Sequence, residues 1–381
     1  MRIAIVGDYP LDETRIWGGE QAAFTYLVRA LCQIDGVQVH VLTLGGKDLA
    51  GQVRRLPSGA TLHVLPPFPR MELYRRFATY QSHLNNKLAE IGADVVHAQG
   101  AIHHGYVALG SGRPAVITVH GVQSEDSKHQ SSFYLRLRKW LVSRLVERYN
   151  LSHTRHLIAI SRYVTSYFSQ LLRSDIDVHY IPNAIDSNFF KLEDQAGGNT
   201  VLFAGRVIQR KRVLDLVQAF AQVAEQCPTA QLRIAGEYQS EKEYSEAIRT
   251  FIKSAKLEQR VHLLGPLGEA DVLQEFARCD VLALPSAQET TPMVIAQAMA
   301  AAKPVVATPV GGVAEMVNDG QTGFLIDLGD ITGQAKALTQ ILQNPALRTQ
   351  MGNAGHQFAI ENYRADSVAR RTYEVYQNMI A

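Results

Sequence analysis

The chain has 381 residues, of which 46% are hydrophobic and 19% charged, a composition typical of a soluble globular protein and not of a disordered or membrane-spanning one. This length exceeds what one hydrophobic core usually organises, so two domains are expected. The net charge of +2 hides an asymmetry, because residues 1–190 carry 20 Lys and Arg against 15 Asp and Glu, and the remainder carries 18 against 21.

The N-terminus and the cysteines indicate the compartment. The first apolar run ends at Gly7, which is too early for a signal peptide, and no apolar run approaches the roughly 20 residues of a membrane span. Cys32, Cys227 and Cys279 are odd in number, scattered and without metal-ligand spacing. Eleven of the 13 histidines precede residue 191, but none has the spacing of a helical zinc site. We therefore expect a cytoplasmic protein with no cofactor and no metal.

Short apolar runs alternate with amphipathic stretches along the whole chain, which is the pattern of βα units and parallel sheets. The first series of predicted strands occupies 2–7, 37–43, 61–65, 95–97, 115–120, 156–160 and 178–181. After a polar stretch at 193–199, interpreted as a linker, the second series occupies 201–204, 231–235, 261–264, 281–284, 305–308 and 323–326. The tail, 332–381, is predicted to be helical.

The two series predict two doubly wound, Rossmann-like α/β domains. We place an N-terminal acceptor-binding domain at 1–190 and a C-terminal nucleotide-binding domain at 191–360. A final helix at 361–381 is expected to pack back toward the N-terminal domain. Sheets of this kind bind ligands at the carboxyl ends of their strands, so a site is expected in a cleft between the domains, on strand-to-helix loops.

The segment 285–308 follows a predicted buried strand and carries the first candidate site. Pro292 suits the first turn of a helix, whose free N–H groups and dipole attract phosphate. Glu289 lies in the loop before that helix, where its carboxylate could accept hydrogen bonds from hydroxyl groups. The alternative is that Glu289 is an ordinary loop acid or helix cap. The neighbouring ligand-binding candidates are Thr290, Thr291, Met293 and Val294.

The segment 201–220 carries the second candidate site. Its strand ends at Gly205, where the missing side chain lets a ligand approach the backbone. Arg206 and Lys211 follow, with Arg210 and Arg212 nearby, and cations at a helix start oppose the helix dipole unless an anion binds there. A solvated basic helix start is the alternative interpretation.

Two further candidates lie in the first half of the chain. Gly18 and Gly19 precede a helix predicted to begin at Gln21, although a plain turn would also explain them. His120 ends the strand 115–120, at the edge where catalytic groups gather, and a structural histidine is the alternative.

These segments together resemble the family-four retaining glycosyltransferases, which have the GT-B fold. Residues 285–308 are similar to the E-x7-E signature of that family, with Glu289 at the first position and Gln297 in place of the second Glu. The resemblance implies that Glu289 contacts hydroxyls of the donor sugar and that Gln297 lies at the ribose position, without the charge-assisted bond of a carboxylate. It also implies that Arg206 and Lys211 hold the donor diphosphate, that Gly18 and Gly19 lie beside it, and that His120 reaches the donor sugar.

The implied function is transfer of a hexose, with retention and without a metal, from a nucleotide-diphosphate sugar to a saccharide or lipid-linked acceptor in polysaccharide or glycolipid synthesis. UDP-hexose is the expected donor and GDP-mannose the second choice. An epimerase of the same fold and a catalytically silent nucleotide-sugar binder remain as alternatives. A nicotinamide-dependent oxidoreductase is disfavoured, because Gly7-Asp8-Tyr9-Pro10 is not the G-x-G-x-x-G motif. No nucleic-acid partner is expected.

The segment 133–149 predicts a basic amphipathic helix. Leu137, Leu141, Leu145 and Tyr149 fall near one face, and Arg136, Trp140 and Arg144 fall on another. A tryptophan among cations suits the headgroup region of an anionic bilayer, so peripheral membrane contact is predicted. The alternative is that Trp140 packs against a neighbouring element.

Overall fold

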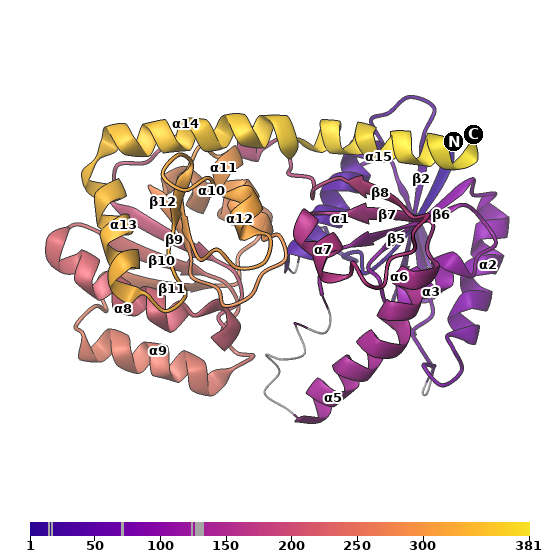
Figure 1. Cartoon of the computed structure of the whole chain (residues 1–381), viewed down its shortest axis with the longest axis horizontal. Coiled ribbons are helices and arrows are strands. Elements are labelled where there is room, and N and C mark those ends of the chain that lie inside the picture. The colour runs from indigo at the N-terminus through magenta and orange to yellow at the C-terminus, as the bar shows by residue number, and fades with distance from the viewer. Residues whose placement is uncertain (14–15, 17, 70–71, 123–124, 126–132) are drawn as a thin grey trace. The chain divides into compact units, whose positions relative to one another are not determined.

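The computed structural model describes residues 1–13, 16, 18–69, 72–122, 125 and 133–381, and the chain divides into two compact units (Figure 1). The N-terminal unit comprises 1–13, 20–184 and 365–381, and the C-terminal unit comprises 14–19 and 185–364. The chain thus passes from the N-terminal to the C-terminal unit between residues 184 and 185, whereas the sequence predicted this boundary between residues 190 and 191. The stretch 193–199 is no linker, because it lies within the C-terminal unit, where Asp194 pairs with Lys303 and the Gly197 amide donates to Asp280.

A mostly parallel sheet forms the centre of the N-terminal unit. Its described strands lie in the order β3-β4-β2-β1-β5-β6-β7-β8, and only β3 runs antiparallel to its neighbour. Seven of the strands coincide with predicted ones, but β3 was missed because its three residues are all exposed and form no apolar run. The bounds are β1 (Arg2–Val6), β2 (Gln38–Leu44), β3 (Val53–Arg55), β4 (Thr61–Leu65), β5 (Val95–Gln99), β6 (Ala115–Val119), β7 (His156–Ala159) and β8 (Asp177–Tyr180).

Helices cover the sheet of the N-terminal unit. Alternate residues of β1, β5, β6 and β7 form one core with apolar residues of α2, α3, α6 and α7. The intervening residues face the other way, where Ile158 of β7 and Val368 of α15 line a common pocket. The helices are α1 (Gly18–Leu31), α2 (Ala78–Ile91), α3 (His103–Leu109), α5 (Phe133–Val142), α6 (Arg148–His153), α7 (Arg162–Tyr167) and α15 (Ala365–Ile380).

The C-terminal unit is built on a parallel sheet in the order β11-β10-β9-β12-β13-β14. The chain starts in the middle of this sheet, winds out to β11, and then crosses to β12 on the other side of β9. That order makes the gap between β9 and β12 a topological switch point, where doubly wound sheets bind ligands. The strands are β9 (Thr200–Ala204), β10 (Gln231–Ala235), β11 (Val261–Gly265), β12 (Val281–Leu284), β13 (Val305–Ala307) and β14 (Gly323–Leu325).

The helices of the C-terminal unit flank this sheet and continue into the predicted helical tail. They are α8 (Val213–Gln226), α9 (Lys242–Ser254), α10 (Glu269–Arg278), α11 (Met293–Ala300), α12 (Val313–Met316), α13 (Ile331–Gln343) and α14 (Pro345–Asn362). Among the described residues of both units, no helix is long and apolar enough to span a bilayer.

Candidate active site

The two candidate loops of the C-terminal unit follow β9 and β12, the strands on either side of the switch point. The loop after β9 begins with Gly205, whose φ of +154° is rare for residues with a side chain. Gly236, after β10, lies so close that a Cβ on it would meet the carbonyl oxygen of Gly205 at 1.8 Å. Both positions therefore require glycine, Gly205 because of its positive φ and Gly236 because of the close approach.

Side chains of a short 3₁₀ turn, Gln209–Lys211, connect the two loops. The ammonium of Lys211 donates to Oε1 of Glu289. Nη1 of Arg210 donates to the backbone oxygen of Gln288 at 2.6 Å and lies 3.7 Å from Oε2 of Glu289. The amide of Ala287 donates in return to the backbone oxygen of Arg210 at 2.8 Å. The structure thus brings Lys211 and Glu289 together and adds Arg210, which the sequence interpretation had left undecided.

Burial and charge act in opposite directions on this cluster. Burial raises the pKa of Glu289, but the charges of Lys211 and Arg210 lower it by more, so its pKa lies below the usual value. Burial lowers the pKa of Lys211, and the carboxylate of Glu289 opposes only part of this shift. A buried carboxylate held ionised between two cations is suited to accept hydrogen bonds from neutral hydroxyls.

Arg206 is exposed, and among the described residues nothing pairs with its guanidinium. Its neighbour Arg212 has a positive φ of 50° and pairs with Asp215 of α8 through a 2.7 Å bond from Nε. Of the cations in this loop, Lys211 and Arg210 therefore contact Glu289, Arg212 pairs with Asp215, and Arg206 is exposed.

The start of α11 provides backbone donors in the same region. Pro292 precedes the helix, and no side chain caps this end, so the first N–H groups of Met293 and Val294 have no side-chain acceptor. The carbonyl of Thr290 accepts from the Gly312 amide at 2.9 Å, which fixes the loop, while the buried Oγ1 of Thr291 has no partner among the described residues. Such a helix end can hold an anion.

Gly18 and Gly19 differ from the prediction, because they form the first turn of α1 instead of preceding it. Gly18 has a φ of +85°, a conformation that lets the chain enter the helix three residues earlier than expected. A Cβ on Gly19 would lie 3.0 Å from Cγ of Met293, so glycine permits close packing on the start of α11. Gln297 lies one turn further along α11, is partly exposed, and has no hydrogen bond to its side-chain amide within the described part of the chain.

His120 directly follows β6 in the N-terminal unit and belongs to a buried polar network. Its Nε2 lies 2.6 Å from Oε1 of Gln99, and the Gln99 amide is 3.1 Å from Nε2 of His97. His97 in turn contacts Oγ1 of Thr118 and the hydroxyl of Tyr376 of α15, both at 2.6 Å. Burial lowers the pKa of His120 to about 4, so the ring is neutral near pH 7.

A small pocket borders this network, with an accessible volume of about 20 Å³, which is enough for about one water molecule. His97, Gln99 and Tyr376 were not predicted as site residues. The only signal in the sequence is that His97 and Gln99 lie at the carboxyl end of a strand, since Tyr376 is 279 residues away from His97.

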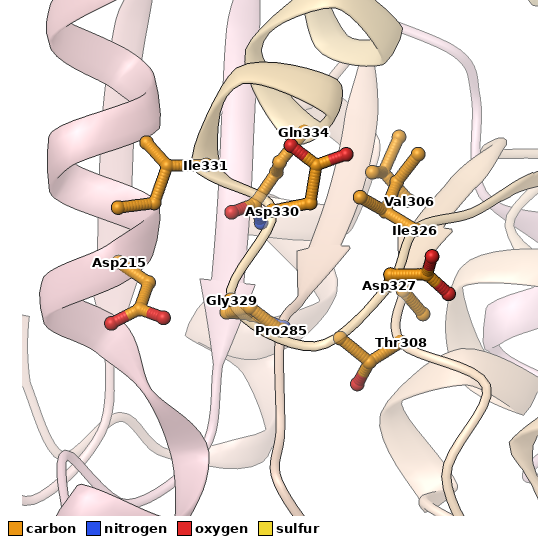
Figure 2. Close-up of a pocket in the computed structure, with 11 residues that line it drawn as sticks. Asp215, Pro285, Val306, Thr308, Ile326, Asp327, Gly329, Asp330, Ile331 and Gln334 are labelled. Carbon is orange, nitrogen blue, oxygen red and sulfur yellow. The ribbon is translucent and has the colours of Figure 1, made fainter.

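A second pocket, in the C-terminal unit, lies at the carboxyl ends of β12, β13 and β14 and does not include Lys211 or Glu289 (Figure 2). Figure 2 shows Asp215, Asp327 and Asp330 around it, and its accessible volume is only about 10 Å³. An acidic lining repels a diphosphate, so we assign no donor-binding role to this pocket.

Comparisons with known proteins identify the class. The family model "Glycosyltransferase Family 4" matches residues 17–189, and "Glycosyl transferases group 1" matches 184–358. The structure of Anabaena Alr3699/HepE in complex with UDP-glucose superposes with a TM-score of 0.73 at 21% identity, covering 99% of this chain and 100% of that one. Two Rossmann-like units with such a neighbour define the GT-B fold.

Two curated relatives extend over nearly the whole chain. N-acetyl-α-D-glucosaminyl L-malate synthase of Bacillus anthracis is 24% identical, over 88% of this chain and 92% of its own. Phosphatidyl-myo-inositol mannosyltransferase of Mycobacterium leprae is 26% identical, over 100% and 97%. The chain belongs to the family-four type of glycosyltransferases, and its activity is glycosyl transfer.

Proposed function

We propose that this chain is a retaining, metal-independent hexosyltransferase that uses a nucleotide-diphosphate sugar. The observation that carries the proposal is the contact of Lys211 and Arg210 with the buried carboxylate of Glu289 at the switch point. Fixed cations there would stabilise the charge that develops on a departing diphosphate, which is a task that other transferases give to a metal ion.

Each residue has a role in this proposal. Lys211 and the exposed Arg206 would bind the diphosphate, together with the N–H groups at the starts of α1 (Gly18, Gly19) and α11. Glu289 would orient the sugar through its hydroxyls, and Gln297 would contact the ribose. His120, neutral and at the carboxyl end of its sheet, would line the reaction centre.

The reaction would exchange one glycosidic bond for another on the same face of the sugar. The bond from the anomeric carbon to the diphosphate breaks, a bond to the acceptor hydroxyl forms, and the departing diphosphate takes the hydroxyl proton. No carboxylate nucleophile is needed, and the protein would contribute mainly positioning and charge stabilisation.

UDP-hexose is the donor we propose, with GDP-mannose as the second candidate, and the UDP-glucose complex of HepE supports the first choice. A thermal-shift comparison of UDP, GDP, ADP and TDP tests this, because a ligand at about 100 times its Kd adds about 2.7 kcal/mol to stability. Stabilisation by UDP alone is expected, and stabilisation by GDP alone would favour the mannose donor.

The acceptor we propose is a saccharide or a lipid-linked molecule, with a role in polysaccharide or glycolipid synthesis. The name of the Mycobacterium leprae relative specifies a lipid acceptor. A silent nucleotide-sugar binder is the second candidate function, favoured by Gln297 in place of the second acid of the signature. Donor turnover distinguishes the two functions. A silent binder would be stabilised by the nucleotide but would not cleave a nucleotide sugar into free nucleotide and sugar.

We also propose that α5 and the following turn dock peripherally on an anionic membrane at its cytoplasmic face. Leu137, Leu141, Leu145 and Tyr149 are between 40% and 61% exposed, and Trp140 is 43% exposed with the Arg144 guanidinium 5.4 Å from its ring centre. The apolar face thus meets solvent. The buried side chains follow α5 instead: Ser143, Val146 and Glu147 lie in a π-helical turn at Ser143–Glu147, and Asn150 and Leu151 lie in α6. An apolar face beside cations suits an anionic bilayer.

A further inference from the structure

Two histidines and an aspartate meet at the amino-terminal ends of β7 and β8, on the opposite edge of the sheet from His120. His156 is the first residue of β7, and Asp177 and His179 lie on β8. The two strands are paired in parallel, with His156 opposite Asp177 and Ile158 opposite His179. Paired strands hold the three side chains on a rigid scaffold, which favours a preformed site.

Both imidazoles place a ring nitrogen near the same carboxylate oxygen. Nε2 of His179 lies 3.2 Å from Oδ2 of Asp177, and Nδ1 of His156 lies 3.6 Å from the same atom. The ligand atoms of all three residues lie within 4.8 Å of one another. The two rings are nearly parallel, with an angle of 17° between their planes.

Neither of these nitrogens is satisfied by a hydrogen bond. Nδ1 of His156 and Nε2 of His179 are both buried and have no hydrogen-bond partner in the described part of the chain. Nε2 of His179 is near enough to Asp177 but does not have the direction of a hydrogen bond. Two buried ring nitrogens beside one carboxylate, neither of them hydrogen-bonded, require an explanation.

The two distances from Asp177 to the imidazole nitrogens fit a tetrahedral metal ion. An ion held at about 2.0–2.1 Å by each of its ligands keeps neighbouring ligand atoms about 3.3–3.4 Å apart. The distances of 3.2 and 3.6 Å bracket that value. The side chain of Asp177 is 56% exposed, so a fourth position would be open to water.

We propose that His156, Asp177 and His179 form a binding site for a divalent metal ion of the zinc type. Two imidazole nitrogens and one carboxylate are ligands that zinc accepts, and a calcium or magnesium site would need more oxygens. The ion would connect the edge strand β8 to β7 and stabilise the sheet. Because the site lies at the amino ends of the strands, the ion would take no part in glycosyl transfer, so this proposal is independent of the proposed function.

A second cluster in the same unit provides the control. Asp8, His103 and His104 also lie within metal-binding distance of one another, but both ring nitrogens of His104 already have partners. Nε2 of His104 is 3.1 Å from Oδ1 of Asp8, and Nδ1 is 2.8 Å from the hydroxyl of Tyr80. Hydrogen bonds thus explain that cluster without an ion.

Calorimetric titration of the whole chain with ZnCl₂, after removal of any polyhistidine tag and treatment with a chelator, tests the proposal. One Zn²⁺ per chain is expected. His156→Ala, His179→Ala and Asp177→Asn should each weaken the affinity at least about 100-fold, since even outer-shell changes cost 10–100-fold. His103→Ala should bind Zn²⁺ like the wild type. No binding by the wild type, unchanged binding by all three site variants, or a loss in His103→Ala would each overturn the proposal.

Two measurements on the wild type keep the test valid if a site variant fails to fold. Saturating Zn²⁺ should raise the thermal unfolding midpoint, by an amount that grows with Zn²⁺ concentration, because an ion that binds only the folded chain stabilises it. Co²⁺ in its place should show the strong visible absorption of a four-coordinate ion. An unchanged midpoint, or only the weak absorption of hydrated Co²⁺, would contradict the site. The rate of donor turnover should be the same with Zn²⁺ and with chelator.

Discussion

The ammonium of Lys211 and the carboxylate of Glu289 form an ion pair between two loops that are 78 residues apart in the chain. Both side chains are largely buried, with 13% and 7% of their surfaces exposed. Removing one member leaves the other charged and buried, which is costly unless a remaining neighbour compensates. Arg210, at 3.7 Å from Glu289, is such a neighbour, so loss of Lys211 should be tolerated by the fold.

The first prediction follows from this pair. Lys211→Ala and Arg206→Ala should each lower donor turnover 100- to 1000-fold, or about 2.7–4 kcal/mol, because each removes a cation from the developing charge on the diphosphate. Steady-state kinetics and a circular dichroism spectrum check the rate and the fold. Arg212→Ala is the matched control, because Arg212 pairs with Asp215, and it should stay within about threefold of wild type. Near-normal rates in both Lys211→Ala and Arg206→Ala would show that these residues do not stabilise the diphosphate.

The second prediction concerns the ribose position. Gln297→Glu should be tolerated and should bind the nucleotide at least as tightly, because a carboxylate makes a stronger, charge-assisted bond to a ribose hydroxyl. Titration calorimetry with UDP measures the Kd. A tenfold loss of affinity would show instead that the amide of Gln297 donates a hydrogen bond that a carboxylate cannot replace.

The third prediction is a pH dependence of stability in the N-terminal unit. Burial lowers the pKa of His97 to about 3, whereas an unfolded histidine has a pKa of about 6.5. Between these values the unfolded chain binds the proton and the folded chain does not, so stability should fall as the pH drops from about 6.5 toward 3. Above about pH 6.5 this contribution should be constant.

Thermal unfolding at a series of pH values from 4.5 to about 7.5 checks this prediction. His97→Asn should make the profile less steep, with the remaining slope due to other buried histidines such as His120. An equivalent change at the exposed His153 of α6 should leave the profile as it is. A wild-type midpoint that stays constant or rises on acidification would show that His97 does not control the stability of this unit.

The fourth prediction concerns membrane docking. Cosedimentation with anionic vesicles should succeed at low salt and weaken at high salt, because each cation near the surface contributes roughly 1 kcal/mol that salt screens. The double variant Trp140→Ala with Arg136→Ala should bind less. Leu328→Ala with Lys336→Ala, which removes an exposed leucine and an exposed cation of the C-terminal unit, should bind normally. Failure to bind anionic and neutral vesicles alike would rule out electrostatic docking.

The sequence predicted the sheets well because most of their strands are buried and rich in apolar residues. The bounds of β4, β10 and β12 agree with the structure to the residue. The exposed strand β3 has no such pattern, and the early start of α1 depends on the positive φ of Gly18, which Gly-Gly alone does not reveal. The stretch 193–199 looks like a linker locally, but Asp280 and Lys303 hold it on the C-terminal unit.

The candidate site was predictable only in part, for a physical reason. Parallel strands place Lys211 and Glu289 at one edge of a sheet, and the sequence is sufficient for that inference. The contact of Arg210 with Gln288, and the bond between His97 and Tyr376, join residues 78 and 279 positions apart and depend on tertiary packing. Neither contact leaves a local periodicity or motif in the sequence.

Donor turnover without acceptor would show whether Glu289 and Lys211 form the centre of a nucleotide-sugar transferase. Wild type and Glu289→Gln, which keeps the shape of the side chain and removes its charge, would be incubated with UDP-glucose and GDP-mannose, and free nucleotide and sugar products measured. We predict slow release of one nucleotide by the wild type, with no epimerised donor, and at least a 100-fold slower release by Glu289→Gln. Stabilisation by the nucleotide with no release from either donor, or equal release by both proteins, would show that Glu289 and Lys211 are not the centre of a transferase.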